Sequence, residues 1–73
     1  MSVLELIERS SARLEASGVC FGHGTRNAFD EAAWLVLWRL GLPLDALDAV
    51  ADRPVTPEQQ AAAEALVEHR ITS

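Results

Sequence analysis

The sequence contains no lysine, no tyrosine and only one cysteine, Cys20, which excludes an internal disulfide. Its six basic residues are all arginines and are outnumbered by eleven acidic residues, which gives a net charge of −5. Such a chain is a poor counterion for phosphate, so direct nucleic-acid binding is disfavoured. The longest apolar run, 32–38, is too short to cross a bilayer, and the N-terminus lacks a signal peptide. We therefore expect a cytoplasmic domain that binds neither nucleic acid nor a membrane.

The length of 73 residues is that of a single small domain. A chain of this size buries only about 60% of its unfolded surface, so its stability is marginal. It therefore needs regular helices, a self-associating surface or a neighbouring domain. No segment alternates apolar and polar residues with a period of two, so no strand is predicted.

Two capping boxes mark helix starts. Ser2 is followed three residues later by Glu5, and Thr56 is followed by Gln59 with the same spacing. In each pair, the side chain of the first residue can accept a hydrogen bond from the backbone N–H of the second. The side chain of the second residue can accept a hydrogen bond from the backbone N–H of the first. Pro57 strengthens the second signal because the first helical position needs no N–H donor.

The middle helix has its own start and stop signals. Asn27 can cap its first turn, and Gly41 can end it in the left-handed conformation, as Gly18 can end the helix before it. The stretch 44–50 is expected to form at most a short helical turn. The predicted fold is all-α, a small three-helix bundle with helices over about 3–17, 28–40 and 57–70.

Helical periodicity assigns an inward stripe to each predicted helix. The predicted core residues are Val3, Leu4, Ile7 and Leu14 in the first helix, Phe29, Ala33, Val36, Leu37 and Leu40 in the second, and Ala62, Ala63, Leu66 and Val67 in the third.

Two tryptophans of the middle helix, Trp34 and Trp38, fall outside this stripe, on the same side as Asp30 and Glu31. Another helix of the domain could cover them, or they could be presented to a partner. The third helix offers mainly alanines to cover them. We expect one of the two tryptophans, but not both, to be exposed.

The loop between the first two helices offers weak candidates for chemistry. Cys20 and His23 have a metal-ligand spacing, but a closed zinc site needs four ligands and the only other histidine is His69. His23 has no neighbouring acid with which to act as a general base. The glycines around it lack the preceding strand and the third glycine of a dinucleotide loop. The sequence therefore predicts no catalytic, cofactor-binding or metal-binding residue.

This loop, the middle helix and the turn after it together resemble a known protein family. It is carried by Phe-Gly-His-Gly-Thr at 21–25, Asn27, Phe-Asp-Glu-Ala at 29–32 and Leu-Pro-Leu-Asp at 42–45. Together they resemble the N-terminal domain of the PrmB branch of HemK-like protein-glutamine methyltransferases, whose substrate is a large-subunit ribosomal protein.

The resemblance implies that residues 1–73 form a helical substrate-recognition domain that precedes a Rossmann-like catalytic domain. That second domain would bind S-adenosylmethionine and carry an Asn-Pro-Pro-Tyr loop, and this chain contains neither tyrosine nor an Asn-Pro pair. The segment by itself is therefore expected to be non-catalytic and to bind no cofactor. The implied partners are the ribosomal protein and the enzyme's own C-terminal catalytic domain. The candidate contact residues are Trp34, Trp38, His23, Thr25 and Asn27.

Two other functions remain alternatives. The chain could be a free-standing acidic interaction module, and the isolated segment could associate weakly with itself through Trp34 and Trp38. A helix-turn-helix DNA-binding protein is the weakest alternative, because the last helix carries Arg70 against three glutamates.

Overall fold

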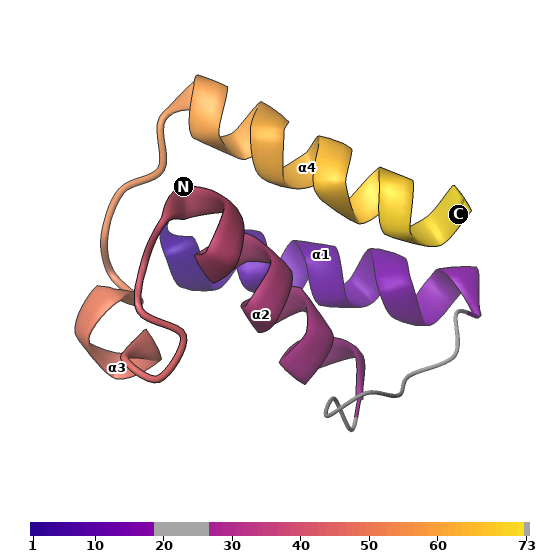
Figure 1. Cartoon of the computed structure of the whole chain (residues 1–73), viewed down its shortest axis with the longest axis horizontal. Helices are drawn as coiled ribbons and strands as arrows, with labels where there is room; N and C mark the ends of the chain where they lie inside the picture. The colour runs from indigo at the N-terminus through magenta and orange to yellow at the C-terminus, as the bar shows by residue number, and fades with distance from the viewer. Residues whose placement is uncertain (19–26, 73) are drawn as a thin grey trace.

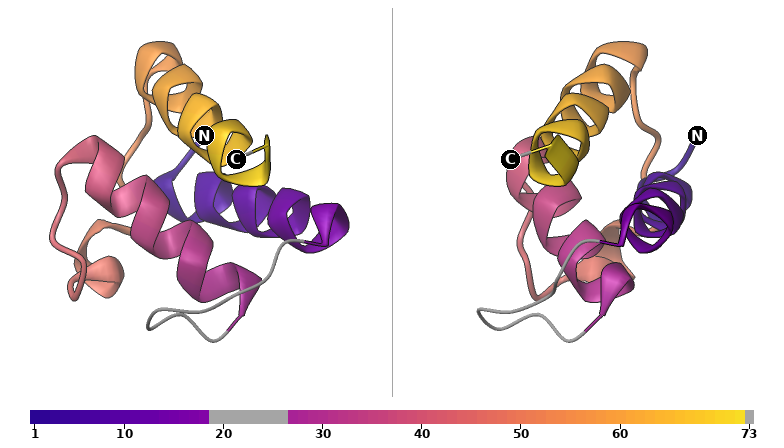
Figure 2. Two further views of the ribbon diagram at one scale, coloured as in Figure 1. Left: turned by 45° about the vertical axis from the view of Figure 1, so that its right-hand side comes forward. Right: turned by 90° about the vertical axis from the view of Figure 1, so that its right-hand side faces the viewer.

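Three long helices and one short helix make up the computed structural model, which describes residues 1–18 and 27–72. The helices are α1 (Val3–Ser17), α2 (Ala28–Leu40), α3 (Leu47–Val50) and α4 (Pro57–Thr72). In Figures 1 and 2, α4 lies against both α1 and α2, and α2 crosses α1. The described ranges contain no strand, only an isolated antiparallel bridge between Ser2 and Pro54. The prediction of a small all-α bundle is confirmed, and α3 lies within the stretch 44–50 where a short helical turn is expected.

Both capping boxes form as predicted. The hydroxyl of Ser2 accepts a hydrogen bond from the Glu5 N–H at 3.2 Å, and the Glu5 carboxylate accepts from the Ser2 N–H at 3.1 Å. At α4, the Thr56 hydroxyl accepts from the Gln59 N–H at 3.1 Å, and the Gln59 side chain accepts from the Thr56 N–H at 3.0 Å. These bonds satisfy backbone donors that the first turn of a helix leaves unpaired.

The limits of α2 also follow the sequence signals. The Asn27 side chain accepts from the Asp30 N–H at 2.9 Å. Gly41 ends the helix at φ 71°, and Gly18 ends α1 at φ 73°. A side chain at either position would be strained in this left-handed conformation.

The start of α1 is tied to the segment between α3 and α4. Three backbone hydrogen bonds join them: Val3 N–H to Arg53 O at 2.9 Å, Leu4 N–H to Ala51 O at 3.0 Å, and Val55 N–H to Met1 O at 2.8 Å. This pairing places the beginning of α4 beside the beginning of α1.

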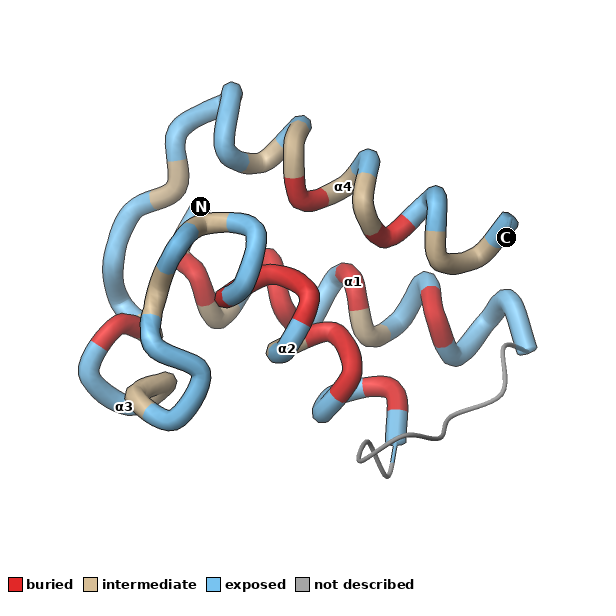
Figure 3. Tube along the Cα trace, viewed as in Figure 1, coloured by how far each residue is buried: buried red, intermediate tan, exposed pale blue. Residues whose placement is uncertain are grey.

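The core lies where α1, α2 and α4 face one another (Figure 3). Its buried apolar residues are Val3, Leu6, Ile7, Leu14, Ala28, Ala32, Leu35, Val36, Leu37, Val50, Ala63 and Val67. Ala62 and Leu66, predicted as core in the last helix, are only partly buried.

The predicted stripe of α2 is partly wrong. Phe29 is 37% exposed, and Ala33 and Leu40 are only partly buried, whereas Ala32 is fully buried. Apolar side chains surround most of α2, so periodicity alone does not show which stripe its neighbours cover. In α1, Leu6 is buried in the core although the predicted stripe does not include it, whereas Leu4, which was predicted as core, is only half-buried.

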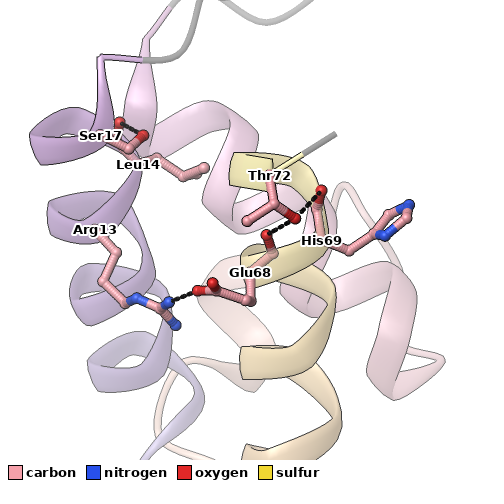
Figure 4. Close-up of polar contacts among 6 residues, drawn as sticks. All are labelled: Arg13, Leu14, Ser17, Glu68, His69 and Thr72. Carbon is pink, nitrogen blue, oxygen red and sulfur yellow. Dashed lines mark hydrogen bonds and ion pairs between the residues drawn. The ribbon is translucent and has the colours of Figure 1, made fainter.

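Two ion pairs hold α4 to the other long helices. Arg13 of α1 pairs with Glu68, as Figure 4 shows, and both side chains are about half exposed. Arg70 pairs with Glu31 of α2, whose side chain is only 9% exposed. The sequence pattern places Glu31 on the same side of the middle helix as the tryptophans. That position is corrected, because α4 packs over it and supplies a cation.

Acid should weaken the first capping box. The hydrogen bond from the Ser2 backbone holds the pKa of the Glu5 carboxyl below its ordinary value of 4.5. A group with a lowered pKa in the folded state stabilises the fold above its unfolded pKa and loses that contribution as the pH falls through the folded value. We therefore expect the free energy of unfolding to fall more steeply below about pH 4.5 in the wild type than in Glu5→Gln. Urea unfolding between pH 7 and pH 3 measures both slopes.

Glu8→Gln is the matched control, because Glu8 lies exposed on the same helix outside the capping box. It should keep the wild-type slope. Equal slopes for the wild type and Glu5→Gln would contradict the prediction.

Candidate protein-interaction site

Both tryptophans of α2 are exposed. Trp34 is 47% exposed and Trp38 is 56% exposed. Their rings stack, with centroids 6.0 Å apart and planes 2° apart, because residues four positions apart are neighbours on a helix.

The prediction that only one of the tryptophans is exposed is therefore wrong. The physical reason is that α1 and α4 both pack on the face of α2 that contains Ala32. The remaining short helix, α3, is a single turn and leaves the two rings uncovered.

The tryptophans belong to a larger apolar surface, which we call the aromatic surface. It consists of Phe29, Trp34, Trp38 and Leu44, which are 37%, 47%, 56% and 48% exposed. Since a tryptophan offers about 250 Å² of surface, the two rings alone leave about 250 Å² open to solvent. Apolar patches of several hundred Å² on a small domain are typical of binding sites.

An open hollow of about 300 Å³ adjoins Trp34. Its walls come from α2, from the turn after it and from α3, and they contain one acidic residue, Asp30. The lining residues are Phe29, Asp30, Ala33, Trp34, Leu37, Leu44 and Leu47.

Sequence reasoning identified the tryptophans but missed this hollow. The signal was Phe29, Ala33 and Leu37, which follow one another at four-residue steps beside the tryptophan side of α2. Leu37 is buried in the core as predicted and forms the floor of the hollow, whereas Phe29 and Ala33, also predicted as core, lie at its rim.

The other predicted contact residues do not join this site. Asn27 caps α2, and its side-chain oxygen bonds to the backbone of Asp30. Cys20, His23 and Thr25 lie outside the described residues. Within 1–18 and 27–72, no three histidine, cysteine or acidic side chains are grouped to hold a metal ion. His69 is exposed and points away from α1 in Figure 4.

The fold and the surface define a small all-α bundle that exposes stacked aromatic rings on one helix. No helix in the described part of the chain has the length and apolar character needed to span a bilayer.

Curated relatives identify the family that this bundle resembles. The chain is 41% identical over 71 residues to the ribosomal protein uL3 glutamine methyltransferase of Burkholderia pseudomallei, a match over 97% of the chain and 23% of the relative. The proteins of the same name from Bordetella pertussis and Neisseria meningitidis serogroup B are 43% and 36% identical over 93% and 94% of the chain, again over 23% of each relative. No family model and no solved structure matches the chain.

The chain is thus a homologue of the uL3 glutamine methyltransferases and spans about a quarter of their length. The resemblance predicted from the sequence is confirmed. The match is consistent with the N-terminal domain of PrmB.

The exposure of Trp38 predicts a small effect on stability. Trp38→Ala should change the free energy of unfolding by about 1 kcal/mol or less, because the ring is more than half exposed and alanine favours the helix. Val67→Ala is the buried comparison and should cost about 2 kcal/mol, from two lost methyl groups and the cavity they leave. Denaturant unfolding of both variants checks this order. A larger loss for Trp38→Ala would show that the ring is part of the core.

Proposed function

We propose that this chain is the substrate-recognition domain of an S-adenosylmethionine-dependent methyltransferase that modifies a glutamine of ribosomal protein uL3. The similarity to proteins of that name over almost the whole chain carries the proposal. The exposed tryptophan pair supports a role in recognition, because tryptophan is enriched among the residues that dominate binding energy at protein interfaces.

The charge of the chain supports a ribosomal protein as partner. The chain has a net charge of −5, with eleven acidic residues against six arginines. A protein that binds ribosomal RNA needs basic residues to neutralise phosphates. An acidic domain attracts such a substrate and repels the RNA. Its charge therefore favours methylation of the ribosomal protein while that protein is free of RNA.

The size of the aromatic surface disfavours a stable homodimer built from it alone. The tryptophan rings expose about 250 Å², whereas a stable interface buries about 800 Å² on each partner. We therefore assign the aromatic surface to the docking of the ribosomal protein, as one anchor within a larger interface that includes other parts of the enzyme.

The cofactor does not fit the residues that the structure describes. S-adenosylmethionine, when bound, supplies the methyl group, but the described residues contain no strand followed by a glycine-rich turn that could hold it. We place it in the part of the family's length that this chain does not span. The role left to this domain is to hold the protein substrate, so that binding energy remote from the glutamine positions the reacting amide.

Truncation of a docking anchor should weaken methylation of the whole protein substrate. In the full-length enzyme, Trp38→Ala should lower kcat/KM for uL3 about thirtyfold, since an interface anchor contributes about 2 kcal/mol. A short peptide around the methylated glutamine, too short to reach α2, should show no such loss. Steady-state methylation assays on both substrates measure the difference.

His69→Ala, a truncation of an exposed ring on α4, is the control variant and should retain wild-type kcat/KM for both substrates. An equal loss on the short peptide would place the effect at the catalytic centre. No loss on either substrate would overturn the docking role of Trp38.

A further inference from the structure

The hollow beside Trp34 combines an apolar lining with one acidic residue, and one class of ligand matches both. Its walls are apolar on most sides, with Leu37, Leu44 and Leu47 among them, and one face is the ring of Trp34. Asp30 provides the only charged side chain among its lining residues. A matching ligand therefore has an aliphatic stem and a single positive charge at its end.

Asp30 is available for such a charge. It is exposed in the first turn of α2, and no ion pair joins its carboxylate to another residue of the described ranges. Its neighbour Glu31 pairs with Arg70 and lies on the buried side. The two adjacent acidic residues thus lie in different places, since Glu31 is buried against α4 and Asp30 lines the hollow.

Trp34 favours a planar cation. It lies one helical turn after Asp30, so both can contact one group that enters the hollow. A guanidinium stacks on an indole face and pairs with a carboxylate through two parallel N–H bonds, which an ammonium group does less well. The volume of about 300 Å³ is at the small end of ligand pockets and suits one long side chain.

We propose that the hollow binds an arginine side chain presented by a segment of the protein partner. The stem of the arginine packs against Leu44 and Leu47, and its guanidinium lies between Trp34 and Asp30. This inference rests on the proposed function, since it names the kind of residue by which the basic substrate engages the aromatic surface. An uncharged apolar side chain would leave the Asp30 carboxylate without a partner at a closed interface, which costs binding energy.

The test compares two peptides that differ only in charge. Acetyl-Gly-Leu-Arg-Leu-Gly-amide is titrated into the 73-residue chain beside the same peptide with citrulline, which keeps the shape of arginine and lacks its charge. The shift of the Trp34 indole N–H signal in NMR spectra reports binding at the hollow. We expect the arginine peptide to bind about five- to tenfold more tightly, as a solvent-exposed ion pair and a cation–π contact together provide.

Two variants locate the effect. Asp30→Asn should lower the preference for arginine over citrulline to about two- to threefold, because the cation–π contact with Trp34 remains. The helix stays folded, because the residue is exposed and its backbone cap is retained. Glu58→Gln removes an acidic residue at the equivalent first turn of α4 and should keep the preference. Equal affinities of the two peptides, absence of binding by both, or a preference that Asp30→Asn leaves undiminished would overturn the inference.

The result can be separated from that of the proposed function. If Trp38→Ala lowers methylation of uL3 while Asp30→Asn leaves both peptide affinities unchanged, recognition by the domain stands and the arginine site falls. If the peptides bind as expected but methylation of uL3 is unaffected by Trp38→Ala, the hollow is a cation site and the proposed docking of uL3 on the aromatic surface falls.

Discussion

The packing of α2 against α1 and α4 is the interaction on which the rest of the structure depends. Helix α2 is apolar around most of its circumference, but two neighbouring helices cover only the face that contains Ala32 and Val36. The remaining apolar side chains lie at the surface, because the described part of the chain contains no further long helix to cover them. The aromatic surface is therefore a consequence of having three long helices and more apolar residues than their contacts can bury.

The small side chains of α4 reinforce this constraint. Its buried contacts come from Ala63 and Val67, which let the helix approach closely but cover little of α2. Ion pairs to Arg13 and Glu31 fix its position at the two sides of this narrow contact. An exposed pair adds little stability, whereas the Arg70–Glu31 pair is partly buried and depends on α4 staying in place. The helix thus closes the core over both α1 and α2.

Local signals predicted the helices well, and tertiary contacts explain the errors. Ser2 with Glu5, Thr56 with Gln59, and Asn27 set the helix starts through bonds between residues three apart, so the sequence alone contains the necessary information. The exposure of Trp34 and the burial of Glu31 depend on which side of α2 receives α4, and no local pattern states that. The hollow was missed for the same reason, since it needs Leu44 and Leu47 to return beside α2.

Asp30 and Glu31 are neighbours in α2 but have different roles, because Glu31 supports the fold and Asp30 is available for recognition. Successive residues on a helix are about 100° apart, so one carboxylate faces α4 and the next lies beside Trp34. Glu31 is buried and needs Arg70, because an unpaired charge there would cost several kcal/mol. Asp30 remains at the surface, where its charge is not required by the fold and can be used by a ligand. A substitution at Asp30 therefore changes what the surface binds, whereas one at Glu31 changes whether α4 stays docked.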